Sequence, residues 1–325
     1  MKNKLFKIFL FSIICLSFFI KSTNYVKADT IYYLGGIPAG FSLNTRGATV
    51  VGLSEFISDG ETVSPGKNAG IRVGDIVLSI DNIDVNSSDD IEKCLKNKSN
   101  VMVKILRGDN IINFAITAKN DVFGNTKLGL FIRNNISGIG TITYVKDGVF
   151  ASLGHPILSE YGNLMEFIDG KLYNCTITGV VKGERGKAGE LRGVFLQNEP
   201  FASIIKNNYT GVYGKISKDN LSKLNLRPIE IAKAEVGEAT IYTTVDGNLP
   251  KEYNISIIKT DINESSNKNL VIKISDKKLL ELTGGIVQGM SGSPILQNGK
   301  LVGAVTHVFV NDPQRGFGIM IENMM

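Results

Sequence analysis

Short runs of β-forming residues, separated by turns rich in glycine, asparagine and aspartate, follow one another along most of this chain. Before residue 119 the clearest runs lie at residues 47–53, 73–80 and 101–106, and after residue 124 at 139–145, 177–181, 239–245 and 253–258. Turn signals about every ten residues, with few helical patterns between them, are typical of β-barrels and β-sandwiches. We therefore predict a mainly β protein, with one short helix at residues 88–95 in its first half.

The composition fits a globular protein of about two domains. The chain has 325 residues, of which 43% are hydrophobic and 21% charged, which excludes disorder, collagen and a bundle of membrane helices. Its formal charge of +5 comes from five lysines within residues 1–28, so the remainder is neutral. A neutral body releases few counterions from a phosphate backbone. We therefore expect no nucleic-acid binding, and protein or peptide partners instead.

The N-terminus has the pattern of an export signal. Lys2, Lys4 and Lys7 precede an apolar run at residues 8–20, and Val-Lys-Ala at 26–28 resembles a small-residue cleavage site. Thirteen residues span about 20 Å as a helix, short of a hydrocarbon core of about 30 Å. We expect residues 1–28 to be a signal peptide, or a retained anchor that gives the only membrane association, and the rest of the chain to be exported.

Cysteine and histidine are too few and too scattered for a metal site or a disulfide framework. Cys15 lies in the N-terminal apolar run, and Cys94 and Cys175 lie far apart. His155 and His307 are the only histidines, and no pair of ligands stands at zinc-binding spacing. We expect no metal and no cofactor.

Residues 69–81 read AGIRVGDIVLSID, which resembles the signature of PDZ domains, and the resemblance covers residues 31–119. It implies that Pro38, Ala39, Gly40 and Phe41 form the loop whose backbone N–H groups hold a peptide carboxylate while the peptide pairs with a strand edge. Because this loop departs from the usual Gly-Leu-Gly-Phe, an internal segment or the protein's own tail is an alternative ligand. A small β-domain without a peptide ligand is the other alternative.

The strongest chemical signal is GMSGSPI at residues 289–295, which is similar to the GDSGGP segment of chymotrypsin-like proteases. Glycines on both sides of Ser291 allow a sharp turn that exposes the hydroxyl and brings successive N–H groups together. We predict Ser291 as the nucleophile and the N–H groups of Gly289 and Ser291 as the oxyanion hole. On the same alignment Thr306, His307 and Val308 lie on the strand that pairs with the substrate.

A serine nucleophile needs a general base, and His155 lies upstream of Ser291 in the order found in chymotrypsin. The acid that orients the imidazole stays open on sequence order alone, with four candidates: Asp246, Asp261, Asp276 and Asp312. Met290 stands where trypsin-like enzymes have an aspartate, so activation through an ion pair with a freed N-terminus is excluded.

Several phrases together resemble the SpoIVB family of sporulation signalling peptidases over nearly the whole chain after the N-terminal segment. They are LGLFIR at 128–133, GIGTIT at 138–143, LGH at 153–155, TGGIVQGMSGSP at 283–294 and GAVTHVFVNDP at 303–313. The resemblance implies a chymotrypsin-like β-barrel serine peptidase domain at residues 124–325 after the PDZ-like domain. It also implies that Asp276 is the third member of the triad, with Asp261 and Asp312 as alternatives.

The same resemblance implies a biological role. The protein would act in the space between the two membranes of the developing spore, cleave itself, and then cleave a membrane-bound regulator of an intramembrane protease, which triggers a late sigma factor. Two rival functions remain. One is a processing protease with a Ser–Lys dyad, for which the nearby lysines are Lys277, Lys278 and Lys300. The other is a secreted PDZ scaffold without activity.

Overall fold

The computed structural model describes residues 31–159, 162–196, 199–262 and 267–325. The predicted signal segment at residues 1–28 lies outside them. No helix in the described part of the chain is long and apolar enough to cross a membrane.

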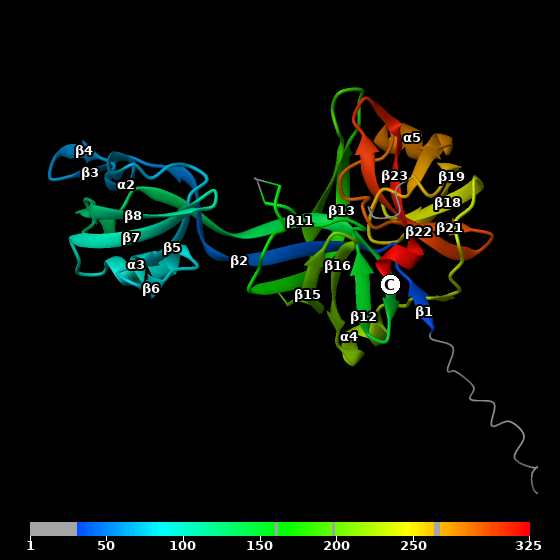
Figure 1. The fold of residues 1–325 in the computed structure, drawn as a ribbon, viewed down its shortest axis with the longest axis horizontal. Coiled ribbons are helices and arrows are strands. Elements are labelled where there is room, and N and C mark those ends of the chain that lie inside the picture. Colours follow the sequence, from blue (N-terminus) through cyan, green and yellow to red (C-terminus); the bar gives the residue numbers. More distant parts are fainter. Residues whose placement is uncertain (1–30, 160–161, 197–198, 263–266) are drawn as a thin grey trace, which may run out of the picture. The chain divides into compact units, whose positions relative to one another are not determined.

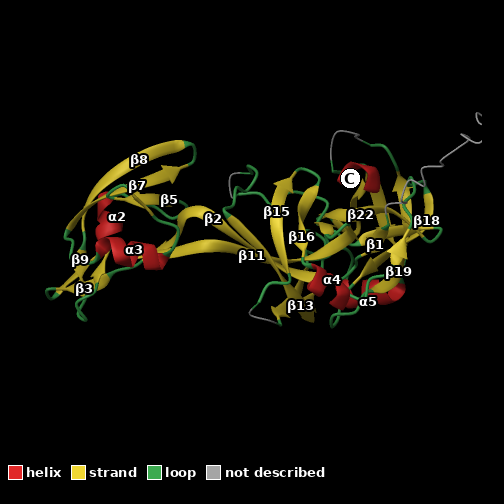
Figure 2. Ribbon diagram, turned by 90° about the horizontal axis from the view of Figure 1, so that it is seen from below, coloured by secondary structure: helices red, strands yellow, loops and turns green. Residues whose placement is uncertain are grey.

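The chain is mainly β, as predicted (Figure 2). Its first part contains β3 (Phe56–Ser58), β4 (Glu61–Val63), α2 (Pro65–Ala69), β5 (Ile76–Ile80), β6 (Ile83–Asp84), α3 (Ser88–Leu95), β7 (Asn100–Arg107), β8 (Asn110–Thr117), β9 (Lys119–Asn120) and β10 (Thr126–Lys127). The predicted helix is α3, and its N-cap is Ser87, whose side chain accepts a hydrogen bond from the Asp90 N–H.

Two long antiparallel strands, β2 (Pro38–Leu53) and β11 (Leu130–Lys146), run beside each other from this first part into the rest of the protein (Figure 1). Around them lie β1 (Tyr32–Leu34), β12 (Val149–Ser152), β13 (Asp169–Val181), β14 (Glu190–Phe195), β15 (Ala202–Asn208), β16 (Gly211–Ile216), α4 (Lys218–Lys223) and β17 (Pro228–Ile229). In the sheet order, β1, β11, β12, β16, β15, β13 and β2 are successive neighbours, and β2 also pairs with β11. Tyr32–Leu34 and the start of β2, which the sequence assigned to the PDZ-like domain, pair with β11 and β13 in this sheet.

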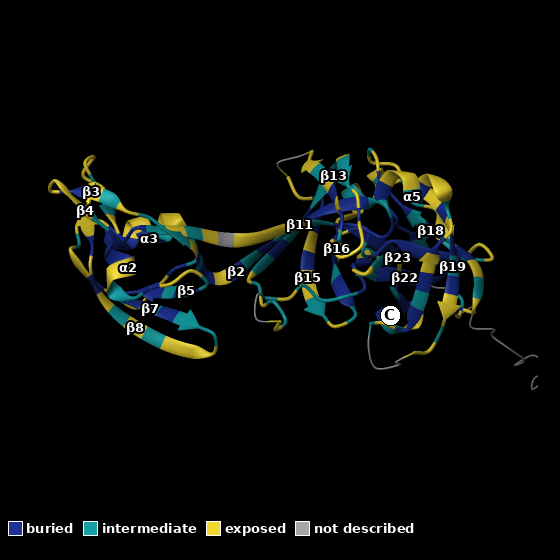
Figure 3. Cartoon of the chain, turned by 90° about the horizontal axis from the view of Figure 1, so that it is seen from above, coloured by how far each residue is buried: buried dark blue, intermediate teal, exposed yellow. Residues whose placement is uncertain are grey.

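The C-terminal part is a closed six-stranded barrel in the order β18, β19, β20, β23, β22, β21. Its elements are β18 (Gly237–Thr243), β19 (Lys251–Lys259), β20 (Leu270–Ile274), α5 (Lys277–Thr283), β21 (Pro294–Gln297), β22 (Lys300–Phe309), β23 (Asp312–Met320) and the 3₁₀ turn η1 (Ile321–Met324). Alternate aliphatic residues of these strands fill the barrel, and β22 and β23 are mostly dark blue in the burial view of Figure 3. The close packing of this apolar interior makes the barrel rigid, so the loops at its rim are attached to a rigid scaffold.

The predicted carboxylate-binding loop is wrong, because Pro38, Ala39, Gly40 and Phe41 are the first residues of β2. This strand pairs with β11 on one side and with β13 on the other. Ala39 and Phe41 are buried in the apolar core, and a Cβ on Gly40 would strike the Phe195 ring. The glycine therefore serves packing, and backbone N–H groups already bound within a sheet cannot hold a peptide carboxylate.

Candidate active site

Ser291 lies in a tight turn between α5 and β21 at the rim of the closed barrel. Gly289 and Gly292, on either side of it, have φ angles of +97° and +90°, which only glycine adopts without strain. A Cβ on Gly292 would also lie 2.1 Å from the Thr141 carbonyl oxygen. Met290 is fully buried in the barrel core, so an apolar anchor occupies the place that an aspartate has in trypsin-like enzymes.

His155 follows β12 in a loop that bends sharply toward the barrel. Leu153 and Gly154 have φ angles of +65° and +68°, and a Cβ on Gly154 would come within 2.9 Å of side chains on β22 and β23. This close approach explains why glycine precedes the histidine. It places the imidazole against β22, with the rings of His155 and His307 4.9 Å apart between centroids.

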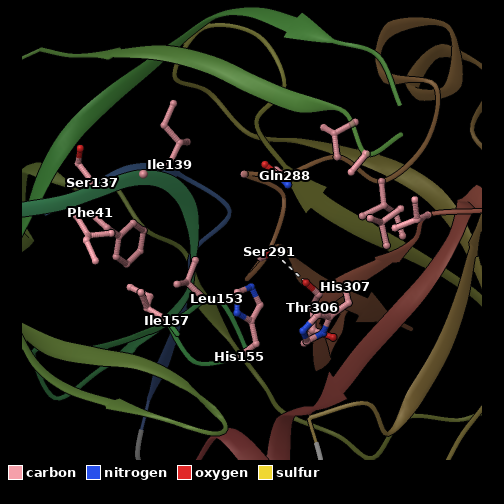
Figure 4. A pocket seen from close by; sticks show the side chains of 18 residues that line it. Phe41, Ser137, Ile139, Leu153, His155, Ile157, Gln288, Ser291, Thr306 and His307 are labelled. Carbon is pink, nitrogen blue, oxygen red and sulfur yellow. Dashed lines mark hydrogen bonds between the residues drawn. The ribbon is translucent and has the colours of Figure 1, made fainter. Parts of the chain in front are cut away.

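A cleft of about 500 Å³ brings most of the predicted site residues together (Figure 4). His155, Gly289, Ser291, Thr306, His307 and Val308 all line it. The remaining walls are largely aliphatic, with Ile139, Ile286 and Val310 among them, and none of the lining residues carries a carboxylate, an ammonium or a guanidinium group. Such a cleft suits an apolar peptide segment.

The serine and the histidine each make a hydrogen bond to backbone in this conformation. The Ser291 hydroxyl donates to the carbonyl of Thr306 at 2.8 Å, the dashed line in Figure 4. Nδ1 of His155 lies 2.9 Å from the carbonyl of Pro156. Since a carbonyl only accepts, a neutral imidazole with this bond carries its proton on Nδ1 and presents Nε2 as the base. The histidine is thus in the tautomer that general-base catalysis requires.

Burial keeps both imidazoles neutral near pH 7. Desolvation lowers the pKa of His155, partly opposed by its hydrogen bond to Pro156. Desolvation, with repulsion from His155 and Lys268, lowers the pKa of His307 to about 4. Nδ1 of His307 is buried and has no hydrogen-bond partner among the described residues. A neutral His155 is ready to accept a proton.

The two amides predicted as the oxyanion hole are available. Among the hydrogen bonds of the described residues, neither the Gly289 N–H nor the Ser291 N–H donates to a protein acceptor. The neighbouring amides differ: the Met290 N–H donates to Val287, and the Gly292 N–H to Val305. Two unpaired donors two residues apart, one of them on the nucleophile itself, are the arrangement that stabilises a tetrahedral oxyanion.

The strand predicted to hold the substrate has one edge that no described strand pairs with beyond Ala304. Thr306, His307 and Val308 belong to β22, which pairs with β23 on one side. On the other side β21 pairs only as far as Ala304. In the described structure the Thr306 carbonyl is taken by Ser291. An extended peptide could pair with the open stretch of β22 by adding a strand.

The carboxylate of Asp276 is committed to the start of α5. Its oxygens accept hydrogen bonds from the N–H groups of Leu279 at 2.9 Å and Asn254 at 3.3 Å. Of the alternatives, Asp312 pairs with Arg315 at 2.6 Å, and Asp261 lies 3.9 Å from Lys233. No described hydrogen bond joins a carboxylate to His155. The capping role of Asp276 is thus established, and its catalytic role stays a prediction.

A closer match to Gly-Leu-Gly-Phe is Leu-Gly-Leu-Phe at residues 128–131, of which Leu130 and Phe131 pair with Leu53 and Gly52 of β2. The carbonyls of Leu128 and Gly129 accept hydrogen bonds from Gly66 and Ser54, and Gly129 has a φ angle of +73°. This turn leads into the start of β11, which contacts α3. A loop, the start of β11 and α3 therefore meet at residues 128–131. The near match of this segment to Gly-Leu-Gly-Phe is visible in the sequence.

No group of three histidine, cysteine or acidic side chains that could hold a metal occurs in the part of the chain that the structure describes. The free cysteines Cys94 and Cys175 are both buried, and burial raises the pKa of each thiol. A buried thiol with a raised pKa is a poor nucleophile.

Comparison with known proteins adds the family. A family model described as SpoIVB peptidase S55 matches residues 124–325, and a PDZ domain model matches residues 56–107. No curated protein matches the chain.

Three solved structures are similar in part. The PDZ domain of an SdrC-like protein from Listeria monocytogenes is 18% identical, with 28% of this chain and 90% of that chain covered and a TM-score of 0.22. An inactive form of the Rv3671c protease is 13% identical, with 57% and 80% covered and a TM-score of 0.33. A serine-to-alanine mutant of that protease from M. tuberculosis H37Rv is 13% identical, with 57% of this chain and 77% of that chain covered and a TM-score of 0.33. The family model, which spans both barrel strands and site, decides the assignment: the chain belongs to the SpoIVB peptidase S55 family and is a serine peptidase with a PDZ domain.

Proposed function

We propose that this serine peptidase is an exported sporulation endopeptidase, which cleaves itself and then a membrane-bound regulator of an intramembrane protease. The observation that carries the proposal is the meeting of Ser291 and His155 in one apolar cleft, in a chain of the SpoIVB peptidase family. The cleft suits an extended apolar segment, and the chain's own N-terminal region contains an apolar run at residues 8–20.

The reaction is acyl transfer to water. The Ser291 hydroxyl leaves the Thr306 carbonyl and turns to Nε2 of His155, which takes its proton as Oγ bonds to the substrate carbonyl carbon. The amides of Gly289 and Ser291 hold the oxyanion. His155 then returns the proton to the leaving amine, and a water molecule, deprotonated by the same imidazole, releases the acyl group.

The groups on Nδ1 of His155 decide how the imidazole is oriented. In the described conformation the Pro156 carbonyl holds this nitrogen. For Asp276 to act as the orienting acid, its carboxylate would have to replace the Pro156 carbonyl on Nδ1 of His155 while it also accepts from the Leu279 and Asn254 N–H groups. The PDZ domain, in this proposal, engages the partner protein and gates self-cleavage.

Self-cleavage is the sharpest test. The full chain and its Ser291→Ala variant are purified in parallel, and their N-termini are followed over time by mass spectrometry. We expect a new N-terminus in the wild type alone, since removing Oγ costs at least about 10⁴-fold in rate. The same new N-terminus in both preparations, or in neither, would refute self-processing.

The rival functions give different results in simple assays. A scaffold without activity would leave Ser291 unreactive toward a fluorophosphonate probe. A Ser–Lys dyad would make one of Lys277, Lys278 and Lys300 as indispensable as His155, although none of the three lines the cleft and Lys300 pairs with Glu230 at 2.8 Å. We expect labelling of Ser291 that depends on His155 and on none of these lysines.

A further inference from the structure

The orientation of the oxyanion-hole amides depends on the carbonyls that precede them. In a trans peptide the N–H points away from the C=O of the same unit, so whatever holds the carbonyl also aims the amide. The Gly289 N–H belongs to the unit that carries the Gln288 carbonyl. The Ser291 N–H belongs to the unit that carries the Met290 carbonyl. Fixing these two carbonyls on the far side fixes both amides toward the cleft.

Both carbonyls are held by hydrogen bonds. The Gln288 carbonyl accepts from the N–H of Leu191 on β14 at 2.8 Å. The Met290 carbonyl accepts twice from one residue, from the Ser293 N–H at 3.0 Å and from the Ser293 hydroxyl at 2.6 Å. The amide of Ser291 is therefore aimed by Ser293, two residues further along the chain.

The hydroxyl of Ser293 is itself held in place from the barrel wall. Ser293 and Thr243, the last residue of β18, are both fully buried, and their hydroxyl oxygens lie 2.8 Å apart. A hydroxyl has one proton, and a carbonyl can only accept. The Ser293 hydroxyl therefore shares its proton between the Met290 carbonyl at 2.6 Å and the Thr243 hydroxyl at 2.8 Å, and the two contacts together fix its direction.

In this chain hydrogen bonds have to hold the Met290–Ser291 peptide, because no ion pair can form at the residue before the nucleophile. In trypsin-like enzymes the residue before the nucleophile is an aspartate that an ammonium group holds, whereas Met290 is buried in the apolar core. We propose that Ser293, oriented by Thr243, is a positioning residue that fixes the Met290–Ser291 peptide so that the Ser291 N–H points at the oxyanion. The proposal rests on Ser291 being the nucleophile, and it goes beyond the biological role proposed above.

The chemistry predicts where the effect falls. The oxyanion develops only in the transition state, so an amide that is no longer aimed weakens binding of the transition state and leaves binding of the substrate nearly unchanged. The Ser293 N–H still holds the Met290 carbonyl after the hydroxyl is removed. We therefore expect Ser293→Ala to lower kcat by about 10- to 100-fold with KM changed less than about twofold.

The test uses the full chain, an apolar fluorogenic peptide as substrate, and a peptide aldehyde of the same sequence. The aldehyde forms a tetrahedral adduct with Ser291, so its inhibition constant reports on the oxyanion hole, whereas the inhibition constant of the matching peptide amide reports on ground-state binding. The variants are Ser293→Ala, Thr243→Val and Thr243→Ser. The control is Ser64→Ala, which removes a buried serine hydroxyl that donates to the Ser54 carbonyl in the first part of the chain.

We expect Ser293→Ala and Thr243→Val to lower kcat and weaken aldehyde binding by similar factors while amide binding holds, and Thr243→Ser to restore most of both. Ser64→Ala should lose only thermal stability. Unchanged kcat in Ser293→Ala would overturn the proposal, and so would a kcat loss without weaker aldehyde binding. If Ser293→Ala fails to fold, the comparison of Thr243→Val with Thr243→Ser decides alone. A different result would refute the proposed self-cleavage, namely an N-terminus that stays unchanged over time in the wild type.

Discussion

The side-chain hydroxyl of Thr141 donates a hydrogen bond of 2.9 Å to the backbone carbonyl of Gly289, 148 residues later in the chain. The backbone N–H of Thr141 donates to the Ser291 carbonyl at 3.0 Å, and Thr143 reaches the Gly292 carbonyl at 2.8 Å. All of these groups on β11 lie on one side of the nucleophile turn. These bonds from β11 therefore hold the nucleophile turn in place.

Thr141→Val tests this support, because valine keeps the shape of threonine and removes the hydroxyl. The Gly289 carbonyl would then be buried without that donor, at a cost of about 1–2 kcal/mol in the free energy of unfolding. We expect kcat to fall about tenfold as well, since the turn carries the oxyanion amides. Urea denaturation and peptide hydrolysis measure the two effects. Thr117→Val, which removes an exposed hydroxyl from β8, is the control, and equal kcat in both variants would contradict the role of Thr141.

Asp276→Asn separates helix capping from catalysis. Asparagine caps helices about as well as aspartate, so the melting temperature should change little. Because the Pro156 carbonyl, and not this carboxylate, holds Nδ1 of His155 in the described structure, we expect kcat/KM to stay within about tenfold of the wild type. Asp276→Ala should cost about 1 kcal/mol of stability. A drop of about 10³-fold or more in Asp276→Asn, with an unchanged melting temperature, would show that Asp276 does orient His155 in the working enzyme.

Val310→Glu tests the apolar character of the cleft. Val310 lines the cleft and is 47% exposed, so the substitution should not disturb folding. The new carboxylate attracts basic side chains and repels acidic ones, and an exposed pair is worth up to about 1 kcal/mol, or about fivefold. We therefore expect the ratio of kcat/KM for a peptide with lysine near the cleavage site to that for the matched glutamate peptide to rise by up to about fivefold in Val310→Glu. Val236→Glu, at an exposed position outside the cleft, should leave the preference of the wild type unaltered.

The two partly buried imidazoles make stability depend on pH. Their pKa values are lowered in the folded chain, that of His307 to about 4, against about 6.5 when unfolded. Below pH 6.5 the unfolded chain therefore binds more protons than the folded one, and stability is lost as the pH falls toward 4. Each such group contributes up to about 1.4 kcal/mol per pH unit in that window. Urea titrations from pH 8 to 4 should show a shallower slope in His307→Gln, and parallel curves would refute this account.

The catalytic turn could be predicted from sequence because its constraints are local. The glycines of GMSGSPI and the Gly-His step at residues 154–155 are required by positive φ angles and close approaches, and both leave a readable pattern. The placement of His155 beside β22 follows from the same glycine. The mainly β class was also readable, because the spacing of turns along the chain reports it directly.

Other features depend on distant partners and left no such pattern. Residues 37–41 read IPAGF, which is typical of a loop, yet pairing on both sides makes Pro38–Leu53 a strand. Proline is tolerated there because Pro38 is the first residue of that strand. The bond from Ser293 to Thr243 and the bonds from β11 to the nucleophile turn link positions far apart in the chain, so only the folded structure reveals them.

β11 connects the turn at residues 128–129 with the turn that carries the nucleophile. The strand starts at Leu130 and reaches Thr141 and Thr143, and its pairing with β2 shifts register between Phe131 and Ile132 and again between Arg133 and Asn135. Because side chains alternate between faces, inserting one residue between those points would turn both threonines away from the nucleophile turn, whereas inserting two would restore their direction. Within the regularly paired stretch from Asn135 to Thr141, an odd insertion should therefore lower peptidase activity more than an even one.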